Sequence, residues 1–120
     1  MTDILPTLEV SLHGFIWRDR RYELGRPCVQ EVSNRGVFRA IRLTRTAELL
    51  PAEELRLVDA AEQTAAALSA AGYFGPFGID GYRYSIDGQV AFCALSEINS
   101  RYSMGFVTGF PQHPSEIFLE

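Results

Sequence analysis

Lysine is missing from this sequence, and all 11 basic residues are arginines. This absence excludes a phosphate-binding loop of the G-x-x-x-x-G-K-[ST] type, in which the lysine reaches the nucleotide phosphates. Cysteine is almost as scarce: Cys28 and Cys93 are the only two, and their spacing fits neither a zinc motif nor a disulfide framework. We expect both to pack as small hydrophobic side chains.

The sequence also has no basic excess and no long apolar run. Its net charge of -4 and its pI of about 5.2 argue against a nucleic-acid partner, because nucleic-acid-binding domains usually carry a basic surface. No stretch approaches the roughly 20 apolar residues that span a bilayer. The first residues, Met1-Thr-Asp-Ile, lack the basic and then apolar layout of a secretory signal. We therefore expect a cytosolic protein with no membrane partner.

The length of 120 residues predicts one domain, 1–120, that buries roughly 65 % of the surface of the unfolded chain. Strand-like stretches come first, over 8–17, 22–32 and 37–43. The second stretch is broken by Gly25 and Pro27, which is typical of an edge strand. A helix and a hairpin follow. The predicted fold class is α+β, with an antiparallel sheet of about five strands packed by one long helix.

The helix is predicted between Pro51 and Gly72. Proline suits the first turn of a helix, and glycine suits the position just after its last turn. Two glutamates, at positions 53 and 54, complement the positive end of the helix dipole. Apolar residues recur every three or four positions, which predicts a single stripe packed on the sheet: Leu55, Val58, Ala61, Ala65 and Leu68.

A hairpin is predicted around Asp87-Gly88, because an Asp-Gly pair between two alternating runs is a strong signal for a two-residue turn. If the residues that flank the turn pair with each other, counting back along both strands places Asp80 opposite Leu95. Glu97 then lies opposite Gly78. Asp80 and Glu97 are therefore expected to be diagonal neighbours on one face, roughly 7 to 8 Å apart at Cα.

Two carboxylates at that spacing can share a divalent cation. Asn99, two residues after Glu97, falls on the same face and adds a neutral oxygen ligand that hard cations accept. Gly78 and Gly81 lack side chains and leave room around the carboxylates. The sequence therefore predicts a metal site of Asp80, Glu97 and Asn99 on a hairpin that covers residues 76–101.

The same residues carry a resemblance to a known family. Gly78-Ile79-Asp80, a hairpin, and then Glu97-Ile-Asn99-Ser-Arg101 resemble the C-terminal metal-binding segment of the ATP-grasp superfamily. Its members are carboxylate-amine ligases and carboxylases that use ATP to make acyl phosphates. The resemblance implies that Asp80, Glu97 and Asn99 bind Mg²⁺ or Mn²⁺ ions that bridge the phosphates of ATP. It also implies a catalytic role for Arg101, as a contact to a small carboxylate substrate or to the transition state.

The chain departs from the family in what it lacks. ATP-grasp enzymes hold the nucleotide between two lobes, with lysines of the first lobe and of the hinge on the phosphates and the adenine. The resemblance covers roughly residues 8–105 and corresponds to the second half of that fold. It implies a partial ATP-grasp domain, the C-terminal lobe, which is inactive without an N-terminal lobe on an upstream segment or a separate chain.

Two other interpretations remain open at the level of sequence. In the first, the chain is a non-catalytic binding or interaction module that keeps the fold without turning over ATP. In the second, Asp80, Glu97 and Asn99 are polar residues on an exposed hairpin face, with solvent or arginine partners.

Histidine offers little further chemistry. His13 follows Glu9 and Ser11 on the predicted polar face of the first strand, and His113 lies near two prolines of the C-terminal tail. We expect His13 to be exposed to solvent rather than to line a nucleotide cleft. No Ser/His/Asp or Cys/His arrangement is indicated.

Overall fold

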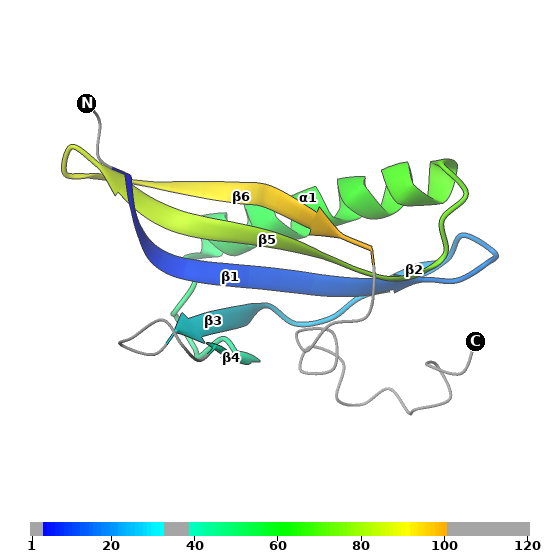
Figure 1. Cartoon of the computed structure of the whole chain (residues 1–120), viewed down its shortest axis with the longest axis horizontal. Coiled ribbons are helices and arrows are strands. Elements are labelled where there is room, and N and C mark those ends of the chain that lie inside the picture. The colour runs from blue at the N-terminus through cyan, green and yellow to red at the C-terminus, as the bar shows by residue number, and fades with distance from the viewer. Residues whose placement is uncertain (1–3, 33–38, 101–120) are drawn as a thin grey trace.

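The computed structural model describes residues 4–32 and 39–100. In these residues the chain forms one helix and a six-stranded sheet in which every pairing is antiparallel (Figure 1). The strand order is β4-β3-β1-β5-β6, and β2 also pairs with β1. The elements follow the order β1 (Ile4–Ile16), β2 (Tyr22–Leu24), β3 (Cys28–Val32), β4 (Arg39–Leu43), α1 (Pro51–Ala70), β5 (Gly75–Ile86) and β6 (Gln89–Asn99).

The predicted α+β class is confirmed, with one long helix on an antiparallel sheet. The described part has six strands where about five were predicted, because the stretch 22–32 forms two strands instead of one. The second of these, β3, lies between β1 and β4 and is not an edge strand. Across residues 4–32 and 39–100, no helix is both long and apolar enough to cross a membrane.

The ends of α1 agree with the sequence signals. The helix begins at Pro51, and the backbone N–H of Leu50 donates a hydrogen bond of 3.0 Å to Oε1 of Glu53 in the first turn. At the other end Gly72 has a φ of 90°, which suits a residue without a side chain. The N–H of Tyr73 then bonds the carbonyl oxygen of Leu68 at 2.9 Å and closes the helix.

The apolar stripe of α1 is shifted from its predicted position. The buried positions are Glu53, Leu57, Ala61, Thr64 and Ala65, whereas Leu55 is 71 % exposed. Leu55 and Leu57 are two positions apart and therefore point to nearly opposite sides of a helix. The stripe that continues through Ala61 at four-residue spacing starts at Leu57, so the prediction was wrong at Leu55.

One face of the sheet packs on this stripe. Val10 and Leu12 of β1, together with Ile79 of β5, form a core cluster with Leu57 and Ala61. Each fully buried valine, leucine or isoleucine side chain stabilises the folded protein by about 1.5–3 kcal/mol. Side chains alternate between the two faces of a strand, so the residues between these positions on β1 and β5 point away from α1.

The β5–β6 hairpin has the predicted turn, in which Asp87 and Gly88 both have positive φ, 50° and 81°. Ile86 pairs with Gln89, as predicted. Farther from the turn the register shifts: between the pairs Tyr82–Cys93 and Asp80–Glu97, β5 advances two residues and β6 advances four.

The register predicted by counting was therefore wrong beyond the shift. Asp80 pairs with Glu97 instead of Leu95, and Gly78 pairs with Asn99 instead of Glu97. Gly81 permits this bulge, because a Cβ there would lie 2.7 Å from the carbonyl oxygen of Cys93. The hydroxyl of Ser96 donates a hydrogen bond of 3.0 Å to the carbonyl oxygen of Asp80 and holds the bulged strand in place.

Candidate metal-binding site

The two predicted carboxylates belong to one cross-strand pair. Asp80 on β5 and Glu97 on β6 are direct partners, and side chains of directly opposed residues point to the same face. Their Cα atoms are therefore separated by about 4.5–5.5 Å, closer than the diagonal spacing predicted from the sequence. This face is the one turned away from α1, because the neighbouring Ile79 packs in the core beneath the helix. The expectation that both carboxylates share one face is confirmed.

The Asp80 carboxylate is held by two side-chain amides. Nδ2 of Asn99 donates a hydrogen bond of 3.2 Å to Oδ2 of Asp80. Nε2 of Gln30, on β3, donates a second one of 3.2 Å to Oδ1. Asp80 and Asn99 are half-buried, whereas Glu97 is exposed. The structure thus brings all three predicted ligands to neighbouring positions on one face.

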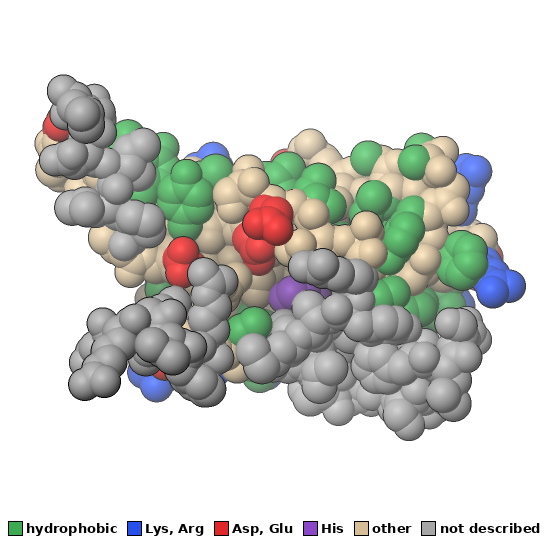
Figure 2. Space-filling model, in the orientation of Figure 1, with side chains coloured by type: hydrophobic (Ala, Val, Ile, Leu, Met, Phe, Trp, Pro, Cys, Tyr) green, Lys and Arg blue, Asp and Glu red, His purple; other side chains and the backbone are tan. Residues whose placement is uncertain are grey.

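The neighbouring strand β1 contributes two polar side chains, Ser11 and His13, to the same face. Ser11 is the β1 partner of Asp80, and His13 is the β1 partner of Gly78. The two β1 side chains are joined by a hydrogen bond of 3.0 Å between Nε2 of His13 and Oγ of Ser11. Gly78 is required here, since a Cβ at this position would lie 2.5 Å from Nδ1 of His13. In Figure 2, acidic and histidine side chains gather near the middle of the visible face.

The burial of His13 corrects the expectation of solvent exposure, because only 5 % of the residue is exposed. Burial lowers the pKa of His13 from 6.5 to about 4, since the cationic form loses its hydration. His13 is therefore neutral at pH 7. It contributes no positive charge to this face.

The cysteines bear out the prediction of packing at one of their two positions. Cys28 is completely buried, and burial raises the pKa of its thiol to about 11, against a smaller opposing effect of Arg26. A thiol in this state is a poor nucleophile. Cys93 is half-buried on β6.

Arg101, predicted to contact a substrate, lies outside the described residues.

The donor set fits a hard divalent cation. Mg²⁺ is commonly bound by one or two carboxylates together with substrate phosphates, and the pair Asp80–Glu97 supplies that number. Within the described residues no group of three or more His, Cys, Asp and Glu side chains could hold a metal ion. The amide of Asn99, which lies next to this pair, is a further candidate ligand. Because its amino group faces Asp80, this amide has to turn over to present its oxygen to a cation.

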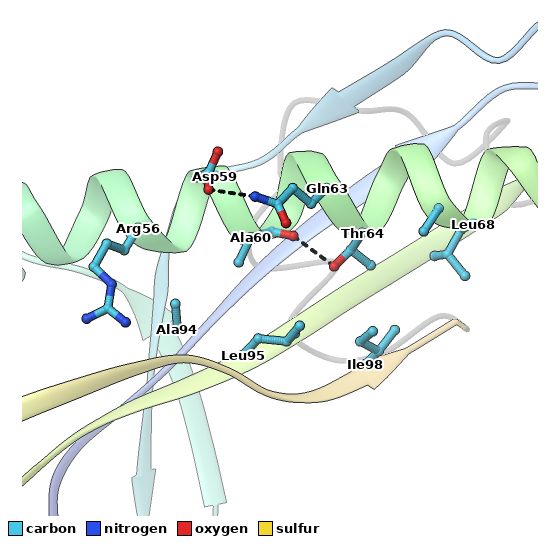
Figure 3. A pocket seen from close by; sticks show the side chains of 10 residues that line it. Arg56, Asp59, Ala60, Gln63, Thr64, Leu68, Ala94, Leu95 and Ile98 are labelled. Atoms are coloured by element: carbon cyan, nitrogen blue, oxygen red, sulfur yellow. Dashed lines mark hydrogen bonds between the residues drawn. The ribbon is translucent and has the colours of Figure 1, made fainter.

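An open groove on the other side of the sheet lies apart from these carboxylates. It has a volume of about 530 Å³ and runs between α1 and β6 (Figure 3). The bulge lets the consecutive residues Ala94 and Leu95 both point toward α1, next to Ile98. On the α1 side of the groove, Nε2 of Gln63 donates a hydrogen bond of 2.8 Å to Asp59, one turn earlier in the helix.

Sequence reasoning missed two residues of the carboxylate face, Gln30 and Ser11. Gln30 lies 50 positions before Asp80 in the chain, and its contact depends on the order in which the strands assemble. Its signal in the sequence is weak, because it is only a polar residue that follows two apolar ones, Cys28 and Val29. Both of these are buried in the structure. Ser11 gives no signal beyond the alternation of its strand.

No protein-family model, curated protein or solved structure matches this chain significantly. The ATP-grasp resemblance therefore rests on the residues of the hairpin alone.

Proposed function

We propose that this chain is the ATP- and Mg²⁺-binding lobe of a cytosolic ATP-grasp ligase that activates a carboxylate as an acyl phosphate. The observation that carries the proposal is the direct cross-strand pair Asp80–Glu97, with Asn99 hydrogen-bonded to Asp80. An acidic residue on one strand and a Glu-x-Asn on the next is the arrangement that the family motif requires. The hydrogen bond further supports the proposal, because it places the third predicted ligand within reach of the first.

The predicted site residues have separate roles in this proposal. Asp80, Glu97 and Asn99 would hold Mg²⁺ or Mn²⁺, which when bound neutralises charge on the transferring phosphoryl group. His13 is neutral and adds no positive charge that would oppose binding of the cation. Arg101 would pair with the substrate carboxylate or with the acyl phosphate, since a guanidinium can bond two oxygens at once.

A second lobe completes the site in this proposal, on an upstream segment or a separate chain. Phosphoryl transfer needs charge stabilisation on more than one side of the nucleotide and exclusion of water, and a single sheet face provides neither fully. The chain also has no lysine for the phosphates. We therefore expect the 120-residue chain alone to bind Mg²⁺-ATP weakly and to release no phosphate from it.

Thermal unfolding tests the proposal. Millimolar Mg²⁺ with ATP should raise the Tm of the wild-type protein, because a ligand that binds only the folded state stabilises it. Asp80→Asn and Glu97→Gln should each abolish this rise. Glu54→Gln, which removes an exposed carboxylate from the first turn of α1, should leave it unchanged. A wild-type Tm that does not respond to Mg²⁺ with ATP would contradict the proposal.

One observation favours an alternative, a non-catalytic binding or interaction module. Both carboxylate oxygens of Asp80 already accept an amide hydrogen bond from the protein, as a residue with a purely structural role would. In that case Mg²⁺-dependent nucleotide binding is absent. The thermal experiment therefore also separates the two functions.

A further inference from the structure

Gln30 reaches the candidate site from two strands away. Gln30 is on β3, where it pairs with Glu9 of β1. Asp80 is on β5, on the other side of β1, where it pairs with Ser11. The side chain of Gln30 therefore crosses over β1 to place Nε2 at 3.2 Å from Oδ1 of Asp80. Ser11 is small enough to leave this path open.

The two amides approach Asp80 from opposite directions. The strand order β3-β1-β5-β6 places Gln30 on one side of β5, and Glu97 and Asn99 together on the other. A cation shared by Asp80 and Glu97 lies on the β6 side, where Asn99 can turn its oxygen toward the ion. Gln30 is on the far side of Asp80 from Glu97, so it is badly placed to act as a ligand.

We propose that Gln30 is a positioning residue that fixes the orientation of the Asp80 carboxylate for cation binding, while Asn99 exchanges its hydrogen bond to Asp80 for a place in the coordination shell. This inference rests on the proposed cation site. A neutral amide suits the task, because it orients the carboxylate without neutralising the charge that attracts the cation. Such outer contacts to metal ligands typically change metal affinity by about 10- to 100-fold.

A positioning role predicts a dependence on the kind of cation. Mg²⁺ and Mn²⁺ demand a near-octahedral arrangement of ligands, whereas Ca²⁺ accepts flexible geometry. Loss of the Gln30 amide should therefore weaken binding of Mn²⁺ more than binding of Ca²⁺. A residue that only stabilises the fold would weaken both equally, in step with the stability of the protein.

The experiment titrates the purified chain with MnCl₂, followed by the electron paramagnetic resonance signal of free Mn²⁺, and separately with CaCl₂ by calorimetry. Gln30→Met keeps the length of the side chain and removes the amide. Gln63→Met is the matched control, because the amide of Gln63 also bonds a carboxylate, that of Asp59, but on the helix side of the sheet. Gln30→Leu provides a second variant in case the flexible methionine impairs folding, and urea unfolding in EDTA reports the stability of each protein.

We expect Gln30→Met to weaken Mn²⁺ binding about 10-fold and Ca²⁺ binding by a smaller factor, with Gln63→Met unchanged. If Asp80→Asn loses Mn²⁺ binding but Gln30→Met and Gln30→Leu bind as wild type does, the positioning role is wrong and the cation site stands. If Mn²⁺ and Ca²⁺ affinities fall equally and follow the loss of stability, the role of Gln30 is structural and the inference is overturned. If the wild-type protein binds no Mn²⁺, the inference fails, and if its Tm also does not respond to Mg²⁺ with ATP, the proposed function fails with it.

Discussion

Asp80 and Glu97 face each other directly across β5 and β6, and the side chain of neither points toward α1. Two like charges in directly opposed positions destabilise a sheet. Gln30 and Asn99 offset this for Asp80 by donating hydrogen bonds to its two oxygens. We expect a cation bound between the two carboxylates to relieve the repulsion between them.

The first prediction separates the two carboxylates by their effect on stability without metal. Glu97→Gln removes the repulsion and should raise the free energy of unfolding by up to about 1 kcal/mol. Asp80→Asn removes the same repulsion, but it replaces one carboxylate oxygen with an amino group, which cannot accept the hydrogen bond from Gln30 or Asn99. This substitution should therefore lower the free energy of unfolding by about 0.5–1.5 kcal/mol. Urea unfolding in EDTA measures both changes. Equal effects of the two substitutions would show that the amides of Gln30 and Asn99 do not hold Asp80.

The second prediction concerns the bulge that brings Asp80 opposite Glu97. A Cβ at Gly81 would lie 2.7 Å from the carbonyl oxygen of Cys93 and 3.0 Å from that of Ala94. Gly81→Ala should therefore push β6 away, cost about 1–3 kcal/mol and weaken any Mg²⁺-dependent rise in Tm. Gly88→Asn is the control, because the turn position has open space and asparagine tolerates a positive φ. Wild-type stability in Gly81→Ala would mean that the bulge needs no glycine.

The third prediction is a pH dependence caused by His13. Its pKa is about 4 in the folded protein and near 6.5 when unfolded. The unfolded state therefore binds more protons between these values, and stability falls as the pH drops below 6.5. Lowering the pH from about 6.5 to about 5.5 should cost roughly 1 kcal/mol, before the carboxylates begin to titrate.

Urea unfolding across this window measures the effect, and His13→Gln should flatten the curve while keeping a hydrogen-bonding group near Ser11. A wild-type curve as flat as that of the variant would contradict the burial of His13.

The fourth prediction concerns the ion pair between the helix and the sheet. Nη2 and Nε of Arg83 bond the two carboxylate oxygens of Glu53 at 2.6 and 2.8 Å, and the Glu53 side chain is only 7 % exposed. The bonds from Arg83 are the main reason that the pKa of Glu53 is lowered. A double-mutant cycle with Glu53→Gln and Arg83→Met should give a coupling of about 1–3 kcal/mol.

The exposed pair Arg21–Asp19 serves as the control for this cycle, since its side chains are 71 % and 64 % exposed. Its coupling should stay below about 0.5 kcal/mol. A similar coupling for both pairs would show that burial adds nothing to the pair between Glu53 and Arg83.

Local signals predicted the local structure well. The turn at Asp87-Gly88 and the helix that begins at Pro51 are both confirmed, because each depends on the backbone preferences of a few adjacent residues. The stripe of α1 was wrong at Leu55, since a helix rich in alanine offers more than one apolar face. Only the sheet decides which of them is buried.

The details of the site depend on contacts between distant parts of the chain. Counting from the turn could not reveal the shift at Gly81, because a bulge inserts residues without an obligatory sequence signal. The burial of His13 and the reach of Gln30 both follow from the placement of β1 between β3 and β5. The shared face of Asp80 and Glu97 was nevertheless predicted, because the bulge adds two residues to β6, an even number, so that β6 presents the same faces beyond the bulge as before it.

The most direct measurement of the central claim is calorimetric titration of ATP into the purified chain, once with Mg²⁺ and once with EDTA. We predict weak binding that requires Mg²⁺, that disappears in Glu97→Gln and that persists in Glu54→Gln. ATP binding of equal strength in EDTA, or in Glu97→Gln, would contradict the assignment of Asp80, Glu97 and Asn99 as ligands of a nucleotide-bound cation.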